Sequence, residues 1–168
     1  MGHGALYAQR RSGWLNMAAE PIHLDPDPLA PYCISPGFKA NGMLYLSGHA
    51  AIGETGQLVG VGDFEAQAQA TFESLQRTLR AGGSDLPNVI KVTIYLTNMS
   101  NFEKVVALRQ KWFSAPYPVD TIVEVSALAL PELMIEIDTT REAFEAEKAI
   151  IDQRIVEQKN QIRLLKER

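Results

Sequence analysis

The chain has 168 residues, 46% of them hydrophobic and 21% charged, with a formal net charge of −4. This composition indicates one soluble globular domain, and it excludes collagen-like and wholly disordered chains and argues against nucleic acid or an anionic membrane as a partner. Cys33 is the only cysteine, which excludes an intramolecular disulfide and a cysteine-based zinc site and favours a reducing compartment such as the cytoplasm.

The first 30 residues differ in composition from the rest of the chain. They contain no acidic residue before Glu20, carry Arg10 and Arg11, and are rich in proline towards their end. An acid-poor, arginine-containing start is typical of a transit peptide, but serine is scarce here and the apolar periodicity is poor. We therefore expect residues 1–30 to form a loosely ordered N-terminal extension.

The main domain is predicted over residues 31–140, and it begins with two short strands. The first is expected near residues 32–39, before the turn signal Asn41-Gly42, and the second over residues 43–47. A glycine-rich loop over residues 53–62 follows. These features predict two short strands separated by a turn, the second of which leads into a loop.

Two helices are predicted from caps and apolar spacing. Asp63 is placed to cap the first helix, and Gly82-Gly83 ends it. Ser100 and Glu103 have capping-box spacing at the start of the second helix, which must end before Pro116. The apolar positions of the first helix recur at helical spacing: Phe64, Ala68, Phe72, Leu75 and Leu79.

Alternating apolar residues predict three more strands. Residues 90–96, 121–128 and 133–139 each have this pattern, and the first has Ile90 on its apolar face. The predicted order of elements is β-β-α-β-α-β-β. This order indicates an α+β sandwich in which two helices cover one face of a sheet.

Residues 141–168 are expected to form an extra, charged C-terminal helix. Thirteen of these 28 residues are charged. A series of positions at alternating spacings of four and three is apolar except at Lys148 and Gln158. The series is Phe144, Lys148, Ile151, Ile155, Gln158, Ile162 and Leu165. Such a polar helix gains little by standing alone, so it would pack on its own domain or across subunits.

Three places carry candidate chemistry. Ser47-Gly48-His49 closes a strand with a hydroxyl, a flexible backbone and an imidazole, which either orients a ligand or is an ordinary turn. Glu124 and Glu136 lie in otherwise apolar strands. Each either faces a half-buried surface, where its carboxylate could act as an acid or base, or points outwards into solvent and has no chemical role. Asp120 stands at a strand entrance. The three histidines have no ligand spacing, so no metal is expected.

Several segments, taken together, resemble one known family. They are Gly42 to Gly48, Gly62 to Gln67, Asn88 to Leu96, Val123-Glu124-Val125 and Ile135-Glu136-Ile137. In this order and spacing they are similar to the Rid family, also called YjgF, over roughly residues 31–140.

The resemblance implies a chorismate-mutase-like (ferredoxin-like) fold and a homotrimer with small-molecule clefts between subunits. Family members of the deaminase group are hydrolases that act on reactive enamines and imines without a cofactor, and some members have been described as ribonucleases. By the same resemblance, Tyr32 matches a cleft tyrosine, and Ser47 and Gly48 match a strand end that contacts substrate. Glu136 matches the glutamate that positions the hydrolytic water.

The departures from the family pattern matter as much. The deaminases hold an arginine where this chain has Asp120, a helix asparagine where it has Val106, and a cysteine where it has Ile122. Such an arginine clamps a substrate carboxylate, whereas an aspartate offers no donor and repels it. Arg109, one turn past Val106, either substitutes for the arginine or lies on a solvated helix face.

The sequence therefore predicts a Rid-like hydrolase outside the 2-imino-acid group. Its ligand would be neutral or cationic, with Glu136 and His49 as the residues that handle protons. The alternative is a non-catalytic trimer that binds a small ligand or regulates a partner. An endoribonuclease fits less well, because the acidic chain offers no basic track with aromatic residues.

Overall fold

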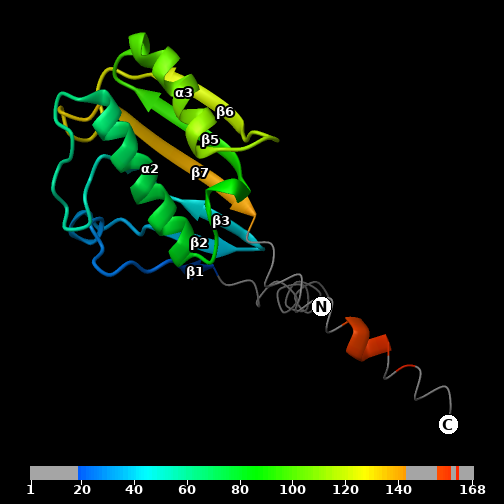
Figure 1. Cartoon of the computed structure of the whole chain (residues 1–168). Helices are drawn as coiled ribbons and strands as arrows, with labels where there is room; N and C mark the ends of the chain where they lie inside the picture. The colour runs from blue at the N-terminus through cyan, green and yellow to red at the C-terminus, as the bar shows by residue number, and fades with distance from the viewer. Residues whose placement is uncertain (1–18, 143–154, 160–161, 163–168) are drawn as a thin grey trace, which may run out of the picture.

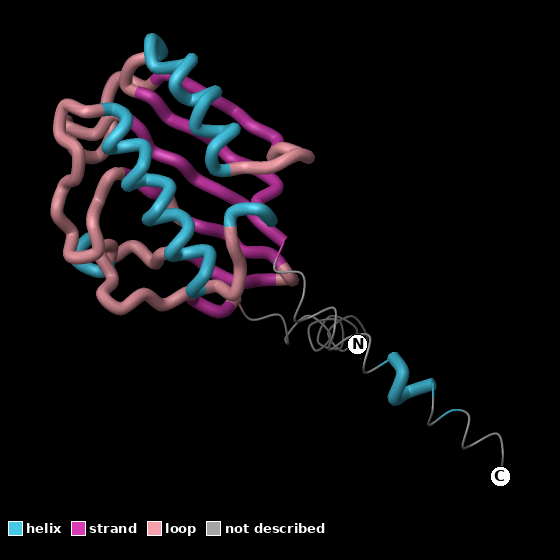
Figure 2. The backbone as a smooth tube through the Cα atoms, in the orientation of Figure 1, coloured by secondary structure: helices cyan, strands magenta, loops and turns pink. Residues whose placement is uncertain are grey.

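The computed structural model describes residues 19–142, 155–159 and 162. Within them, two helices lie on one face of a single seven-stranded sheet (Figures 1 and 2). The sheet order is β1-β2-β3-β7-β5-β6, with the short β4 also paired to β7. Only β5 and β6 pair in parallel. The strands are β1 (Glu20–Pro21), β2 (Gly37–Ala40), β3 (Met43–Leu46), β4 (His49–Ala50), β5 (Val89–Leu96), β6 (Val119–Glu124) and β7 (Ile135–Glu142).

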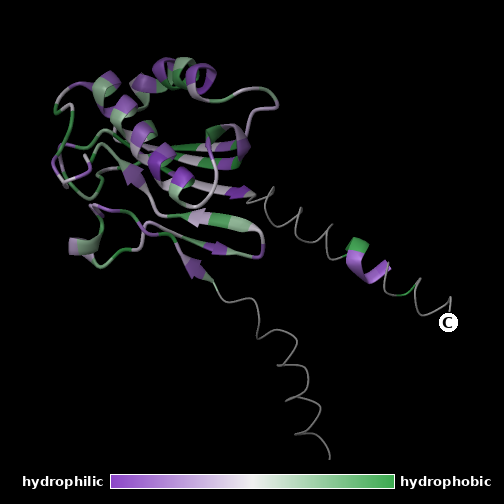
Figure 3. Ribbon diagram, turned by 60° about the horizontal axis from the view of Figure 1, so that its bottom comes forward, coloured by the Kyte–Doolittle hydropathy of each residue, from purple (hydrophilic) through white to green (hydrophobic). Residues whose placement is uncertain are grey.

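The helices are α2 (Phe64–Ala81) and α3 (Phe102–Trp112), and the mixed α+β class expected from the sequence is confirmed. The Asp63 carboxylate caps α2 by accepting a hydrogen bond from the Ala66 N–H (3.1 Å), and Gly83 has a positive φ of 82° just beyond the C-terminus of α2. All five predicted apolar positions of α2 are buried, and Figure 3 shows hydrophobic and hydrophilic residues alternating along the helices. No described helix is long and apolar enough to cross a membrane.

The core lies between the helices and one face of the sheet. Ile135 and Ile137 are buried in this core as expected, and Val92, Ile94 and Leu96 of β5 join them. Leu133 is buried as well, beside this cluster. Ile90 is instead 43% exposed, because the ladder between β5 and β7 shifts register between Val89 and Lys91. One extra residue in a strand turns the side chains before it to the other face.

Several predicted boundaries differ from the structure. The strand predicted over residues 133–139 runs from Ile135 to Glu142, so residues 141–142 belong to β7 and not to the predicted C-terminal helix. The first strand begins at Gly37, because residues 30–32 form a 3₁₀ turn and Cys33 has a positive φ of 58°. The strand predicted over residues 121–128 runs instead from Val119 to Glu124. The capping box of Ser100 and Glu103 is not used, since the Asn98 side chain accepts from the Ser100 N–H and starts a 3₁₀ turn (Met99–Asn101) that leads into α3.

The described part of the N-terminal segment belongs to the folded unit. β1 pairs with β2, and Ile22 is a core residue with 5% exposure, although composition suggested an extension as far as residue 30. At the other end, residues 155–159 and 162 are helical, and Ile155 and Ile162 are exposed. Residues 143–154, 160–161 and 163–168 of the predicted C-terminal helix lie outside the described residues, as do residues 1–18.

Candidate functional site

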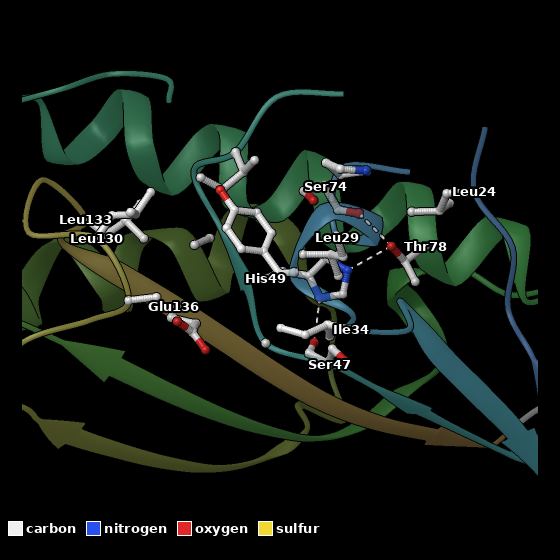
Figure 4. Close-up of a pocket in the computed structure, with 16 residues that line it drawn as sticks. Leu24, Leu29, Ile34, Ser47, His49, Ser74, Thr78, Leu130, Leu133 and Glu136 are labelled. Carbon is white, nitrogen blue, oxygen red and sulfur yellow. Dashed lines mark hydrogen bonds between the residues drawn. The ribbon is translucent and has the colours of Figure 1, made fainter. Parts of the chain in front are cut away.

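The predicted site residues fall into two separate hollows of the chain. Tyr32, Ser47, Gly48, His49 and Glu136 line a cavity of about 290 Å³ beside α2 (Figure 4). The other three predicted residues line a groove between α3 and β6: Val106, Asp120 and Ile122. The two sets of lining residues do not overlap.

A β-bulge shapes the first hollow. Tyr45 pairs with Thr140 and His49 pairs with Ile137, so residues 46–48 stand opposite residues 138–139 only. The extra residue turns His49 towards the helices and leaves Gly48 against Glu136 of β7. A Cβ atom on residue 48 would overlap the Glu136 carboxylate. Glycine at this position therefore permits the close approach of Glu136 to the backbone.

His49 is fully engaged inside the protein. It is 4% exposed, and its Nδ1 lies 2.7 Å from the Ser47 carbonyl oxygen, while its Nε2 lies 2.8 Å from Thr78 Oγ1. Because a carbonyl can only accept, Nδ1 carries the proton and Nε2 accepts from the Thr78 hydroxyl. Burial lowers the pKa of His49 to about 4, although the bond to Ser47 acts in the opposite direction. The ring is therefore neutral near pH 7.

The neutral ring predicts an acid-sensitive fold. Between pH 6.5 and about 4 the unfolded chain binds a proton at His49 that the folded chain does not. The contribution of His49 to the free energy of unfolding is therefore fully present above pH 6.5. It is lost as the pH falls towards 4, by about 3 kcal/mol in total. Thermal unfolding followed by circular dichroism is expected to show this loss, and His49→Asn is expected to show a smaller slope of Tm against pH. An unchanged slope in that variant would place the acid sensitivity elsewhere.

Glu136 is half-buried, and no described residue donates a hydrogen bond to its carboxylate. It stands opposite Tyr95 of β5 and on the same face of the sheet as Asp138. Burial, followed by the negative charge of Asp138, raises the pKa of Glu136 above its ordinary value. A carboxylate with a raised pKa and free lone pairs can accept a proton from water and return it to a leaving group.

The groove between α3 and β6 contains an ion pair that sequence reasoning did not predict. Arg109 Nε donates to Asp120 Oδ2 at 2.6 Å, and both side chains are largely covered, with 23% and 20% exposure. The guanidinium also lies 5.9 Å from the ring centre of Phe102. Arg109 therefore does not lie on a solvated face. Asp120 in turn is neutralised by a partner eleven residues earlier, on a different element.

Other residues have structural tasks or were missed. Glu124 is exposed and accepts a hydrogen bond from the Met99 N–H at 2.5 Å, so it anchors the turn before α3.

Gln67 of α2 holds the loop before β7, although the sequence did not indicate it as a site residue. Its side chain donates a hydrogen bond to the Glu132 carbonyl at 2.7 Å and accepts one from the Met134 N–H at 2.8 Å. These two bonds fix the loop that leads into β7 and forms part of the cavity wall. No short motif distinguishes such a glutamine in the sequence.

A family model described as Endoribonuclease L-PSP matches residues 23–143. A RutC family protein of Pyrococcus horikoshii is 36% identical over 114 residues, which are 67% of this chain and 87% of that protein. Reactive Intermediate Deaminase A of Arabidopsis thaliana is 36% identical over 106 residues, or 62% of this chain and 55% of that protein. The crystal structure of the Rid family protein YyfA from Yersinia pestis superposes with a TM-score of 0.69 at 30% identity, covering 74% of this chain and 99% of that chain.

Proposed function

The chain belongs to the Rid family, and on that premise we propose that it hydrolyses a small, neutral imine or enamine, with Glu136 positioning the attacking water. The observation that carries this proposal is the Glu136 carboxylate. It is half-buried, accepts no hydrogen bond from the described residues and lines an apolar cavity beside Gly48. The deaminase name of the Arabidopsis relative supports the reaction class.

The reaction balances with water as the only co-reactant. Glu136 accepts a proton from water while the oxygen bonds to the imine carbon, and the imine nitrogen takes up a proton from bulk solvent, which gives a carbinolamine. Glu136 then returns its proton to the amino nitrogen, the hydroxyl proton passes to solvent as the C–N bond breaks, and ammonia leaves while a carbonyl product remains. An enamine enters the same route after protonation at carbon. His49 orients Ser47 and Gly48 and does not exchange protons, because both its nitrogens are bonded within the protein.

We place the complete site between two copies of the chain in a homotrimer. The separation of the predicted residues into two hollows supports this arrangement, since one copy would supply the Glu136 cavity and its neighbour the Asp120 groove. Light scattering is expected to give three times the chain mass of 18.6 kDa. A monomer that retains full activity would contradict the shared site.

The charges around the cleft favour a neutral ligand. The described residues that line the Glu136 cavity include no lysine or arginine. In the groove, the guanidinium of Arg109 is committed through Nε to Asp120. A substrate carboxylate would therefore meet the unpaired carboxylate of Glu136 in the cavity. In the groove it would meet the ion pair of Arg109 and Asp120, whose charges cancel. A ribonuclease, the activity in the family model's description, would need cations for phosphate, so it is not our proposal.

The direct test follows ammonia release from imines generated in situ. Neutral imines and 2-aminoacrylate are supplied in parallel to the wild type and to Glu136→Ala. Hydrolysis of a neutral imine that depends on Glu136 is the expected result. If no imine is hydrolysed faster than in buffer while Glu136→Ala leaves ligand binding intact, the chain is a non-catalytic binding protein and the enzyme proposal is rejected.

Gly48→Ala is expected to separate activity from stability. The new Cβ would displace the Glu136 carboxylate, which is the mobile end of a side chain, so the backbone need not move. We expect Tm to change little and imine hydrolysis to fall by about 10-fold or more, because a misplaced base loses most of its effect. Gly53→Ala is the matched control, because its new Cβ would likewise displace only the end of a flexible side chain, that of Gln57, and because Gly53 does not line the cavity. A large loss of Tm in Gly48→Ala would show that the glycine serves the fold.

A further inference from the structure

The cavity that holds Glu136 has walls suited to an apolar group. Its aliphatic lining comes from the N-terminal segment, the loop after β4 and the loop before β7: Leu24, Leu29, Ile34, Ile52, Leu130 and Leu133. Several of these, with Glu136, are labelled in Figure 4. The N-terminal segment thus forms one wall of the site, although its composition suggested an extension outside the domain.

The polar side chains in this wall are mostly satisfied within the protein. Ser47 Oγ donates to the Ser35 carbonyl at 2.7 Å, and His49 and Thr78 bond to each other. They offer little to a polar ligand, because their hydrogen-bonding groups are already used. The loop between β6 and β7 is held by Gln67, so the opposite wall is anchored to α2.

The size of the cavity suggests how large the apolar group is. Its volume is about 290 Å³, whereas a dry apolar cavity of roughly 150 Å³ accommodates benzene in another protein. A methyl group would leave most of the space unfilled, and unfilled apolar space forfeits contacts. An aryl or branched alkyl group fits the available volume.

We propose that this cavity selects neutral imines whose carbon bears an aryl, arylmethyl or branched alkyl substituent, and that the substituent occupies the space between residues 24–34 and 129–133. This inference rests on the proposed function, in which Glu136 acts on the adjacent C–N bond. Residues of the two walls, Ile34 and Leu130 among them, then determine specificity without touching the reacting atoms. Burying the substituent raises kcat/KM by roughly fourfold for each methylene.

The test compares imines that differ only in the substituent. An amine oxidase converts ethylamine, isobutylamine and 2-phenylethylamine into the corresponding imines, and semicarbazide competes with the protein for each imine. The phenylacetaldehyde imine is expected to exceed the acetaldehyde imine in kcat/KM by roughly 30- to 100-fold. Equal values for the two imines would overturn the inference while leaving the proposed hydrolysis intact.

Wall variants locate the specificity. Ile34→Ala and Leu130→Ala are expected to lower the ratio of the two kcat/KM values by roughly three- to tenfold, and Ala129→Phe is expected to lower it by filling the space. Ile90→Ala is the matched control, because Ile90 is 43% exposed against 46% for Ile34 but does not line the cavity. The same change of ratio in Ile34→Ala and Ile90→Ala would contradict the assignment of the wall.

A binding measurement keeps this inference distinct from catalysis. Phenylacetamide, acetamide and phenylacetate are titrated into the full chain by calorimetry as neutral-aryl, small and charged probes. We expect phenylacetamide to bind and the other two to bind at least tenfold more weakly. If phenylacetamide binds in this way while no imine is hydrolysed, the proposed function fails and the ligand class stands. If phenylacetate binds as well as phenylacetamide, the ligand is not restricted to neutral groups and the inference fails.

Discussion

Glu136→Gln is expected to lower kcat/KM for hydrolysis of a neutral imine by about 10²- to 10³-fold, which is the usual contribution of a positioned acid or base. The amide keeps the shape of the carboxylate but cannot accept a proton from water. Burial and the charge of Asp138 raise the pKa of Glu136, so removing this carboxyl is not expected to destabilise the fold at pH 7. Initial rates, Tm and oligomeric mass are measured together.

The pH profile supplies the control for this variant. If Glu136 acts as a base, the rate of the wild type falls as the pH drops through the raised pKa of Glu136. The residual rate of Glu136→Gln should lack this acid limb, and Glu132→Gln, a matched change at an exposed glutamate four residues earlier, should retain it. A residual rate in Glu136→Gln within threefold of the wild type would assign the chemistry to another group.

Much of the fold follows from local signals in the sequence. Asp63 and Gly83 define the ends of α2 through hydrogen bonding and backbone conformation, both of which depend on neighbouring residues only. The alternation in β7 likewise identifies its buried face. Ile90 was misassigned because a bulge depends on the partner strand, which sequence periodicity does not reveal.

The candidate site was harder to predict, because its parts come together from distant segments. The motif residues Gly48 and Glu136 do lie in contact, because the bulge in residues 46–48, opposite β7, brings the Gly48 backbone against Glu136. His49 was expected to handle protons, yet its bonds to Ser47 and Thr78 and its burial give it a positioning role in our proposal. The apolar walls carry no motif at all, since isolated leucines and isoleucines in loops resemble ordinary core residues.

Charge in the α3–β6 groove is expected to determine whether the cleft accepts a carboxylate. In the wild type, the charges of Arg109 and Asp120 cancel in a 2.6 Å pair. Asp120→Arg combined with Arg109→Gln removes the acid and places one unpaired guanidinium on β6, where it can form two charge-assisted hydrogen bonds to a carboxylate. We expect hydrolysis of 2-aminoacrylate, relative to that of a neutral imine, to rise by about 10- to 100-fold.

The single variants test whether charge or shape is responsible. Arg109→Gln leaves Asp120 unpaired, and the preference for 2-aminoacrylate should fall below that of the wild type. Asp120→Asn releases Arg109 without moving it, and the preference should rise by less than in the double variant, because Arg109 stays on the helix. Steady-state kinetics on both substrates give the preference for each variant. If all four proteins share one preference, the groove does not face the substrate, and the proposed site between two copies of the chain must be abandoned with it.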